Sequence, residues 1–244
     1  MDDARGKGAV LTAAVRTVAQ TGSTNADLAE LARSGAGEGL WLRAERQTAG
    51  RGRQAREWVS PAGNLYASTL VRLRPSDPPP ATLALVAAVA LEEVVAVFGV
   101  RATLKWPNDL LVEGAKLSGI LLERVDDAVI IGFGVNLAEA PHDLDRAATS
   151  MAAHGGAPDP QLFADTLAES FERWVARWRG EELATVRDRW TARAHPVGTA
   201  LTARLADGSS LDGLFGGLDA SGALMLRLAD GSVRVIHAAD VFLL

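Results

Sequence analysis

The residues with the clearest chemical use in this sequence are three arginines set among glycines, in the segment ERQTAGRGRQAREW at 45–58. The guanidinium groups of Arg51, Arg53 and Arg56 can each bind two oxygens of a carboxylate or phosphate. Gly50 and Gly52 allow the main chain to approach an anion closely. The segment lacks GxxxxGK followed by Ser or Thr, the pattern of a P-loop. It therefore predicts an anion-binding loop of another kind or a solvated basic loop.

A second set of polar residues lies in LKWPNDLLVEGAKLSGILLE at 104–123. Lys116 is predicted to re-enter a strand beside Ser118 and Gly119, whose small size leaves room for a ligand. An ammonium there either neutralises an oxyanion or belongs to a surface lysine whose stem covers apolar residues. Asn108 and Asp109 fit a turn, and they equally fit a site where a carboxylate positions a metal ion or a water molecule.

Two further side chains suit a nucleotide. Trp58 closes the arginine-glycine segment, and its indole either covers a flat purine or is buried in the core, which is the commoner case. Asn136 ends the segment GFGVN at 132–136, where its amide is placed either beside a nucleotide or in a plain turn after a strand. Both interpretations stay open for each residue.

The tetrapeptide GSTN at 22–25 opens a predicted helix. Thr24 with Asp27 three residues later fits a capping box. Alternatively, the hydroxyl and amide groups of Ser23, Thr24 and Asn25 offer donors and acceptors to a small polar ligand at the helix N-terminus.

Strands and helices that would position these residues alternate up to about residue 193. Side-chain alternation predicts strands at 40–46, 64–73 and 127–137, with shorter ones at 104–106 and 117–123. Helical periodicity predicts helices at 25–33, 81–98 and 160–179. The last helix carries a stripe that we assign to the core: Phe163, Leu167, Phe171, Trp174, Val175 and Trp178.

After Val197 the predicted secondary structure changes to short strands, which are separated by turn signals at Asp207-Gly208, Ser221-Gly222 and Asp230-Gly231. This pattern predicts a small all-β barrel. The hexapeptide RLADGS occurs at 204–209 and 227–232, and we attribute the similarity to turn chemistry because repeat architectures need three or more units. The boundary is placed near His195, which gives domains of 1–194 and 195–244.

Composition narrows the classes of protein that fit. The chain is 48% hydrophobic, has no cysteine and carries a formal net charge of −5, which argues against broad affinity for nucleic acid. The N-terminus lacks a secretory signal. The apolar run at 81–100 contains Glu92 and Glu93 near its middle, so it is predicted to be a buried helix and not a membrane span. We expect a cytoplasmic protein without membrane contacts.

Taken together and in this order, GSTN, QTAGRGR, KWPND, AKLSGIL and GFGVN resemble the motifs of the biotin protein ligases. The resemblance covers residues 22–137 specifically and continues more weakly to the end. It implies an α/β (α+β) fold, in which a mixed sheet flanked by helices forms a catalytic domain like that of the biotin and lipoate ligases and class II synthetases. An SH3-like barrel is expected to follow it.

The resemblance also implies roles for individual residues. Biotin would be held at its ureido ring by Ser23, Thr24, Asn25 and Gln47. The loop of Gly50, Arg51, Gly52 and Arg53 would order over the biotin carboxylate and the adenylate phosphate, where Lys116 also acts. ATP or the adenylate would contact Arg51, Arg56, Trp58, Asn108, Lys116 and Asn136, while Asn108 and Asp109 lie where Mg-ATP is oriented. The catalytic residues would be Lys116, Arg53 and Asp109, with no metal held by the protein.

The activity implied is a two-step ligase reaction. ATP, with Mg²⁺, and biotin would form biotinyl-5′-adenylate, from which biotin passes to a lysine of a biotin carboxyl carrier domain of a carboxylase. A monomer or weak homodimer is expected. A lipoate or octanoate ligase or transferase is the alternative within the same fold superfamily. Outside it, the alternatives are a non-catalytic biotin-sensing regulator and a nucleotide-binding scaffold.

The sequence differs from the family pattern at two places, and each difference leads to an expectation about the protein. Ala55 stands where the family loop usually has a second glycine, so strain is expected there if this position needs positive φ. The repressor members carry a helix-turn-helix domain before GSTN, and the short segment before Gly22 leaves no room for one. We therefore expect no DNA-binding domain.

Overall fold

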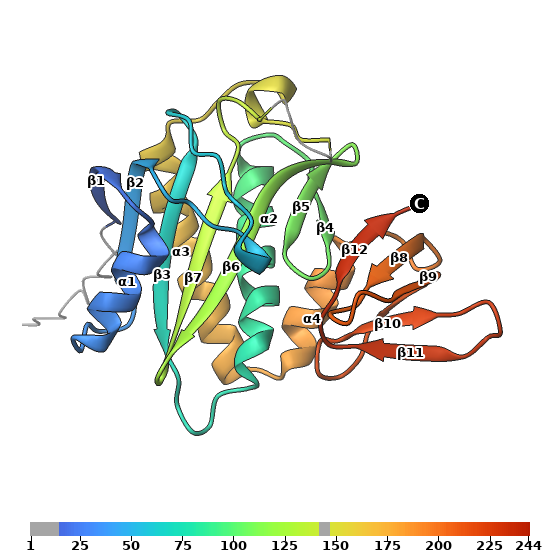
Figure 1. Ribbon diagram of the computed structural model, residues 1–244. Helices are drawn as coiled ribbons and strands as arrows, with labels where there is room; N and C mark the ends of the chain where they lie inside the picture. The colour runs from blue at the N-terminus through green and yellow to red at the C-terminus, as the bar shows by residue number, and fades with distance from the viewer. Residues whose placement is uncertain (1–14, 142–146) are drawn as a thin grey trace, which may run out of the picture.

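A seven-stranded mixed sheet forms the centre of the protein (Figure 1). The computed structural model describes residues 15–141 and 147–244. The strand order is β1-β2-β3-β7-β6-β5-β4, with β1 and β2 parallel and every other pair antiparallel. The bounds are β1 Val15–Thr21, β2 Trp41–Gln47, β3 Leu65–Arg72, β4 Thr103–Lys105, β5 Asp109–Val112, β6 Ala115–Val125 and β7 Ala128–Val135.

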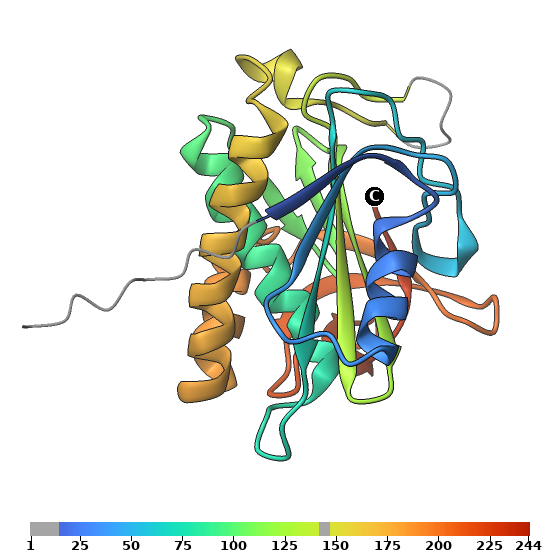
Figure 2. The same cartoon turned by 90° about the vertical axis from the view of Figure 1, so that its left-hand side faces the viewer.

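Helices cover both faces of this sheet, as the two views at right angles show (Figure 2). Neighbouring residues of one strand point to opposite faces, and the sheet uses this alternation to build two apolar layers. Trp41, Val71 and Ile131 pack toward α2 (Leu83–Val97) and α3 (Pro160–Gly180), whereas Leu42, Leu70 and Ile130 pack against α1 (Thr24–Arg33). The expected mixed sheet flanked by helices is confirmed.

The apolar helix α2 lies in the core. Within the described residues, one helical stretch, Pro80–Val97, is long and apolar enough to cross a membrane, but 67% of that window is buried in the protein. Its two acids pair with neighbouring helices: Glu92 with Arg189 at 3.2 Å, on α4 (Leu183–Thr191), and Glu93 with the Trp174 indole N–H at 2.8 Å. The predicted buried helix is confirmed, and so is the buried stripe of α3.

The C-terminal part forms a five-stranded antiparallel sheet in the order β11-β10-β9-β8-β12. Its strands are β8 Ala200–Arg204, β9 Ser210–Leu218, β10 Leu224–Arg227, β11 Val233–Ile236 and β12 Asp240–Leu243. The two RLADGS copies are turns of one type, because in each the aspartate side chain accepts from the serine main-chain N–H at 2.9 Å. The predicted small all-β unit is confirmed.

One hydrophobic core runs through both sheets. Trp190 of α4 meets Phe215 of β9 edge to face, with ring centroids 6.4 Å apart, and both belong to the main buried cluster. Three short 3-10 turns complete the described elements, at Arg53–Ala55, Pro80–Thr82 and Met151–His154. The division into domains at residue 195 stays a prediction, and the first fourteen residues, where a secretory signal was not expected, lie outside the described part.

Candidate active site

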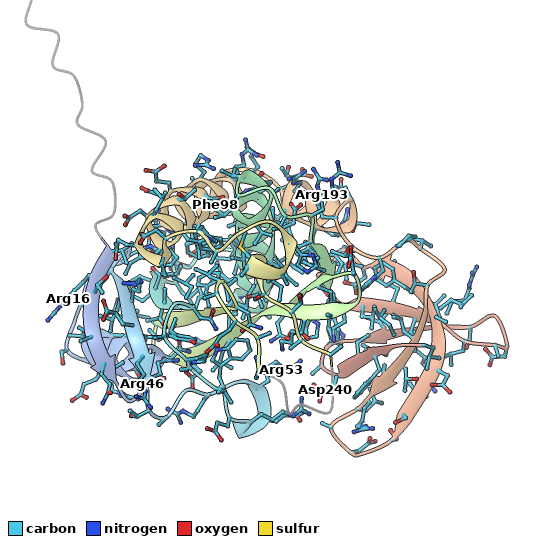
Figure 3. All side chains as sticks on the ribbon, turned by 90° about the horizontal axis from the view of Figure 1, so that it is seen from above. Arg16, Arg46, Arg53, Phe98, Arg193 and Asp240 are labelled. Atoms are coloured by element: carbon cyan, nitrogen blue, oxygen red, sulfur yellow. The ribbon has the colours of Figure 1, made fainter. Side chains whose placement is uncertain are left out.

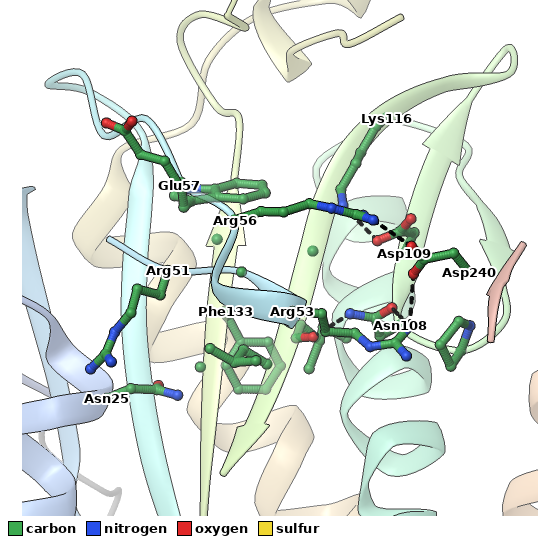
Figure 4. Close-up of a pocket in the computed structure, with 18 of the residues that line it drawn as sticks. Asn25, Arg51, Arg53, Arg56, Glu57, Asn108, Asp109, Lys116, Phe133 and Asp240 are labelled. Carbon is green, nitrogen blue, oxygen red and sulfur yellow. Dashed lines mark hydrogen bonds and ion pairs between the residues drawn. The ribbon is translucent and has the colours of Figure 1, made fainter. Parts of the chain in front are cut away.

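A cavity of about 580 Å³ lies where the seven-stranded sheet, the arginine-glycine loop and strand β12 meet. Figure 4 shows Asn25 and Arg51 on one side of it and Asn108, Asp109, Lys116 and Asp240 on the other. Nearly all of the residues singled out from the sequence line this cavity: Ser23, Thr24, Asn25, Gln47, Arg51, Gly52, Arg53, Arg56, Trp58, Asn108, Asp109 and Lys116. Gly50 and Asn136 are not among its lining residues.

The polar groups at one end of the cavity come from the first turn of α1. Ser23 is the N-cap and makes no side-chain capping hydrogen bond, so the capping box considered for Thr24 and Asp27 is wrong. Instead, the main-chain N–H of Thr24 donates to Gln47 Oε1 at 2.9 Å, and Thr24 Oγ1 lies 2.7 Å from Ser68 Oγ. The hydroxyl of Thr24 is thus held by β2 and β3 and not used to cap its helix.

Glycines on β6 and β7 form the floor of the cavity. A Cβ on Gly132 would collide with Asn25 Oδ1, and one on Gly134 would lie 2.5 Å from the Trp58 ring. A Cβ on Gly119 would lie 3.1 Å from Lys116 Nζ. These positions explain the two glycines of GFGVN, because any side chain there would fill space that Asn25, Trp58 and Lys116 occupy.

Trp58 lies in the cavity wall and not in the core. Its ring is half-buried over Gly134, and Lys116 Nζ lies 5.6 Å from the ring centroid. The indole Nε1 is buried and has no hydrogen-bond partner within the described residues. The aromatic ring of Trp58 therefore faces the part of the cavity where the lysine lies.

Two lysines share one buried carboxylate at the other end of the cavity. Lys116 Nζ lies 2.7 Å from Asp109 Oδ1, and Lys105 Nζ lies 3.0 Å from Asp109 Oδ2. Burial raises the pKa of the Asp109 carboxyl, but the charges of Lys116 and Lys105 outweigh burial and leave this pKa below its ordinary value. With the carboxylate ionised, the three groups carry a net positive charge that suits an anion.

The arginines of the loop contact the C-terminal sheet. Arg56 Nη2 lies 2.5 Å from Asp240 Oδ2, and Arg53 Nη1 donates to the Ala239 carbonyl at 3.2 Å. Figure 3 shows Arg53 beside Asp240 at the junction of the two sheets. Asp240, Val241 and Phe242 of β12 and Arg204 of β8 line the cavity, and the sequence analysis assigned none of them to the site. No local motif marks them, since they reach the cavity only through tertiary folding.

Within the loop, Gln54 has a positive φ of 55°, a backbone conformation that favours glycine. The strain expected at Ala55 stays a prediction. Gly50 is needed for another reason: a Cβ there would lie 2.6 Å from the Trp58 carbonyl, where the two ends of the loop meet.

Asn136 lies behind the cavity. Its side-chain amide donates to the Thr149 carbonyl at 3.0 Å and to the Lys116 carbonyl at 3.5 Å. The predicted direct contact with a nucleotide is not supported by this position, which fixes instead the main chain that carries Lys116. No cluster of three or more His, Cys, Asp or Glu able to hold a metal ion occurs among residues 15–141 and 147–244.

The chain belongs to the Biotin/lipoate A/B protein ligase family, whose sequence model matches residues 18–136. The model of the Biotin protein ligase C terminal domain matches residues 200–244. The resemblance to the biotin protein ligases is thereby confirmed.

Individual relatives agree with this assignment. The chain is 43% identical to the biotin--[acetyl-CoA-carboxylase] ligase of Paracoccus denitrificans, over 92% of this chain and 98% of the relative. It is 38% identical to the enzyme of that name from Mycobacterium tuberculosis, over 92% and 86% of the two chains. The fold matches biotin protein ligase from Aquifex aeolicus in complex with biotin and ATP, with a TM-score of 0.85 and 23% identity over 94% and 99% of the chains.

Proposed function

We propose that this protein is a biotin--[acetyl-CoA-carboxylase] ligase, which uses ATP to activate biotin and then biotinylates a carrier lysine. The observation that carries the proposal is the convergence of Arg53, Arg56 and Lys116, from a loop and from a strand, on the cavity whose other end is lined by Ser23, Thr24 and Asn25. The polar end suits the ureido ring of biotin, and the cationic end suits the carboxylate and the phosphates.

In the first step, a carboxylate oxygen of biotin attacks the α-phosphorus of ATP, and the bond from that phosphorus to the bridging oxygen of pyrophosphate breaks. Negative charge grows on the phosphate oxygens during this displacement. Arg53 and Lys116, at the cationic end of the cavity, would stabilise that charge, and Arg51 would join them when the loop closes. Trp58 would cover the adenine.

In the second step, the neutral ε-amine of a carrier lysine attacks the acyl carbon of biotinyl-5′-adenylate. The bond from this carbon to the AMP oxygen breaks, and the amine proton passes to solvent or to the departing phosphate. Closure of the arginine-glycine loop would exclude water from the adenylate until the carrier arrives. The acceptor is the biotin carboxyl carrier domain of a biotin-dependent carboxylase.

Asp109 is assigned to the positioning of Lys116 in preference to a metal ion. Both of its oxygens are already used by ammonium groups, one by Lys116 and one by Lys105. Mg²⁺ would enter with ATP as part of the substrate, oriented near Asn108. We further propose a cytoplasmic monomer or weak homodimer that has no nucleic-acid partner, with residues 1–194 as the catalytic domain and 195–244 as the SH3-like domain.

The discriminating experiment is the exchange of labelled pyrophosphate into ATP, with biotin, lipoate or octanoate offered singly. Exchange that depends on biotin is expected. Exchange with lipoate alone would favour a lipoate ligase of the same family, whereas a biotin-sensing regulator would bind biotin without exchange. Transfer of biotin to a purified carrier domain then tests the second step.

A further inference from the structure

A carboxylate outside the cavity is hydrogen-bonded to the polar end of the cavity wall. Glu123, near the end of β6, accepts a hydrogen bond from Asn25 Nδ2 at 2.7 Å. Asn25 lines the cavity and is buried, whereas Glu123 is not among the lining residues. Glu123 can therefore influence a bound ligand through Asn25, without touching it.

This partly buried bond leads into two buried hydrogen bonds. Ser68 Oγ donates to Asn25 Oδ1 at 2.6 Å, and Thr24 Oγ1 lies 2.7 Å from Ser68 Oγ. Asn25, Ser68 and Thr24 are 4%, 0% and 3% exposed. Because bulk water does not reach these groups, a donor or acceptor that loses its partner here is costly.

The carboxylate fixes the direction of every bond in the chain. An ionised carboxylate only accepts, so Asn25 must turn its NH₂ group toward Glu123 and its oxygen toward Ser68. The proton of Ser68 is then used on Asn25, and Ser68 Oγ can only accept from Thr24. The proton of Thr24 is used in turn, because both neighbours of its hydroxyl accept: Ser68 Oγ at 2.7 Å and Gln47 Oε1 at 3.2 Å. The Thr24 oxygen therefore keeps a free lone pair at the wall of the cavity.

We propose that Glu123 is a positioning residue, which sets the direction of these bonds and so makes Thr24 an acceptor for an N–H group of the ligand. The inference rests on the proposed function, in which the ligand is biotin and the N–H groups belong to its ureido ring. Without the carboxylate, Asn25 can rotate by half a turn, and the Ser68 proton is released from Asn25. Ser68 can then donate to Thr24 Oγ1, whose own proton goes to Gln47 Oε1 at 3.2 Å, and so compete with the ligand N–H for the Thr24 oxygen.

The test is Glu123→Gln, since the amide has nearly the same shape but both donates and accepts. The KM for biotin in pyrophosphate exchange is expected to rise roughly tenfold, as for the loss of one hydrogen bond in a buried network. The kcat and the KM for ATP should stay within about twofold, because the cationic end is untouched. Glu30→Gln, at an exposed position of α1, is the matched control and should behave as wild type.

Ser68→Ala interrupts the same chain at its middle and gives a second, independent readout. It should raise the KM for biotin in the same way, and combining it with Glu123→Gln should add little, because one chain can be broken only once. A wild-type KM for biotin in Glu123→Gln overturns the inference. The inference is also overturned if kcat falls, or the KM for ATP rises, by as large a factor as the KM for biotin rises. Such a result would indicate a general structural role.

Two further outcomes are distinguishable. Should Glu123→Gln not fold, Ser68→Ala decides alone, and a wild-type KM for biotin in that variant overturns the inference. If the wild-type protein itself shows no biotin-dependent exchange, the proposed function fails before any variant is compared.

Discussion

Arg56 and Asp240 form an ion pair that joins the loop after β2 to the last strand of the C-terminal sheet, 184 positions later in the chain. The same carboxylate lies 3.6 Å from Arg53 Nη1 and is buried. A second connection runs from Lys105 Nζ to the Val241 carbonyl at 2.9 Å. Arg53 and Arg56 of the loop and Lys105 of the lysine pair are thus bonded to β12.

Asp240→Ala should loosen the arginine-glycine loop while the fold stays intact. A partly exposed ion pair contributes up to about 1 kcal/mol, so the loop should open about fivefold more often. Limited digestion with trypsin, followed by mass spectrometry of cleavage after Arg51, Arg53 and Arg56, measures this opening. Asp212→Ala, at an exposed position of the same sheet, is the control. Equal loop cleavage in both variants would show that Asp240 does not restrain the loop.

Gly134→Ala should impair the use of ATP more than the use of biotin. The added Cβ would lie 2.5 Å from the Trp58 ring, so the ring must move from its present position. Stacking of a base on an aromatic ring is worth about 1–3 kcal/mol, and we expect the KM for ATP to rise by roughly tenfold. The KM for biotin serves as the internal control. An unchanged KM for ATP would contradict the role assigned to Trp58.

Asp109→Asn should destabilise the protein near neutral pH. Removing one partner of a buried ion pair costs about 3–5 kcal/mol because the lysines lose their counter-charge. The folded-state pKa of Asp109 is depressed, so its stabilising effect is fully present above the unfolded pKa and is lost as the pH falls through the folded pKa. Urea unfolding of both proteins should therefore show a stability difference at pH 7 that shrinks below about pH 4. A difference that is constant with pH would contradict this assignment.

Patterns of residues within one segment were sufficient to predict most of the fold and about half of the residues that line the cavity. The apolar stripe of α3 marks the one face that this helix buries. Strands β3 and β7 are eight residues long and buried along most of their length, and their side chains do not follow helical spacing. No pattern in the sequence marked β1, β5 or α4. The edge strand β1 is mostly exposed, the four residues of β5 are all buried and do not alternate, and α4 has only two buried residues.

These patterns could not predict which side chains pair when the residues lie far apart in the sequence. The pairing of Asp240 with Arg56, like that of Glu123 with Asn25, depends on how the strands are ordered in space. Asn136 illustrates the converse, since its motif suggested a nucleotide contact, whereas the folded chain places its amide on main-chain carbonyls. The residue types within a segment indicate which functional groups it can offer. The tertiary structure determines which partners these groups contact.

We propose that Arg53 and Lys116 act on one reacting centre, the phosphate and carboxylate that meet between them. The most direct measurement is biotin-dependent pyrophosphate exchange in Arg53→Ala, Lys116→Ala and the double variant, with folding checked by circular dichroism. Each single change should lower exchange by roughly 100-fold or more, and the double variant should be far less impaired than the product of the two effects. Wild-type exchange in either single variant, or strictly multiplicative losses in the double variant, would contradict the account.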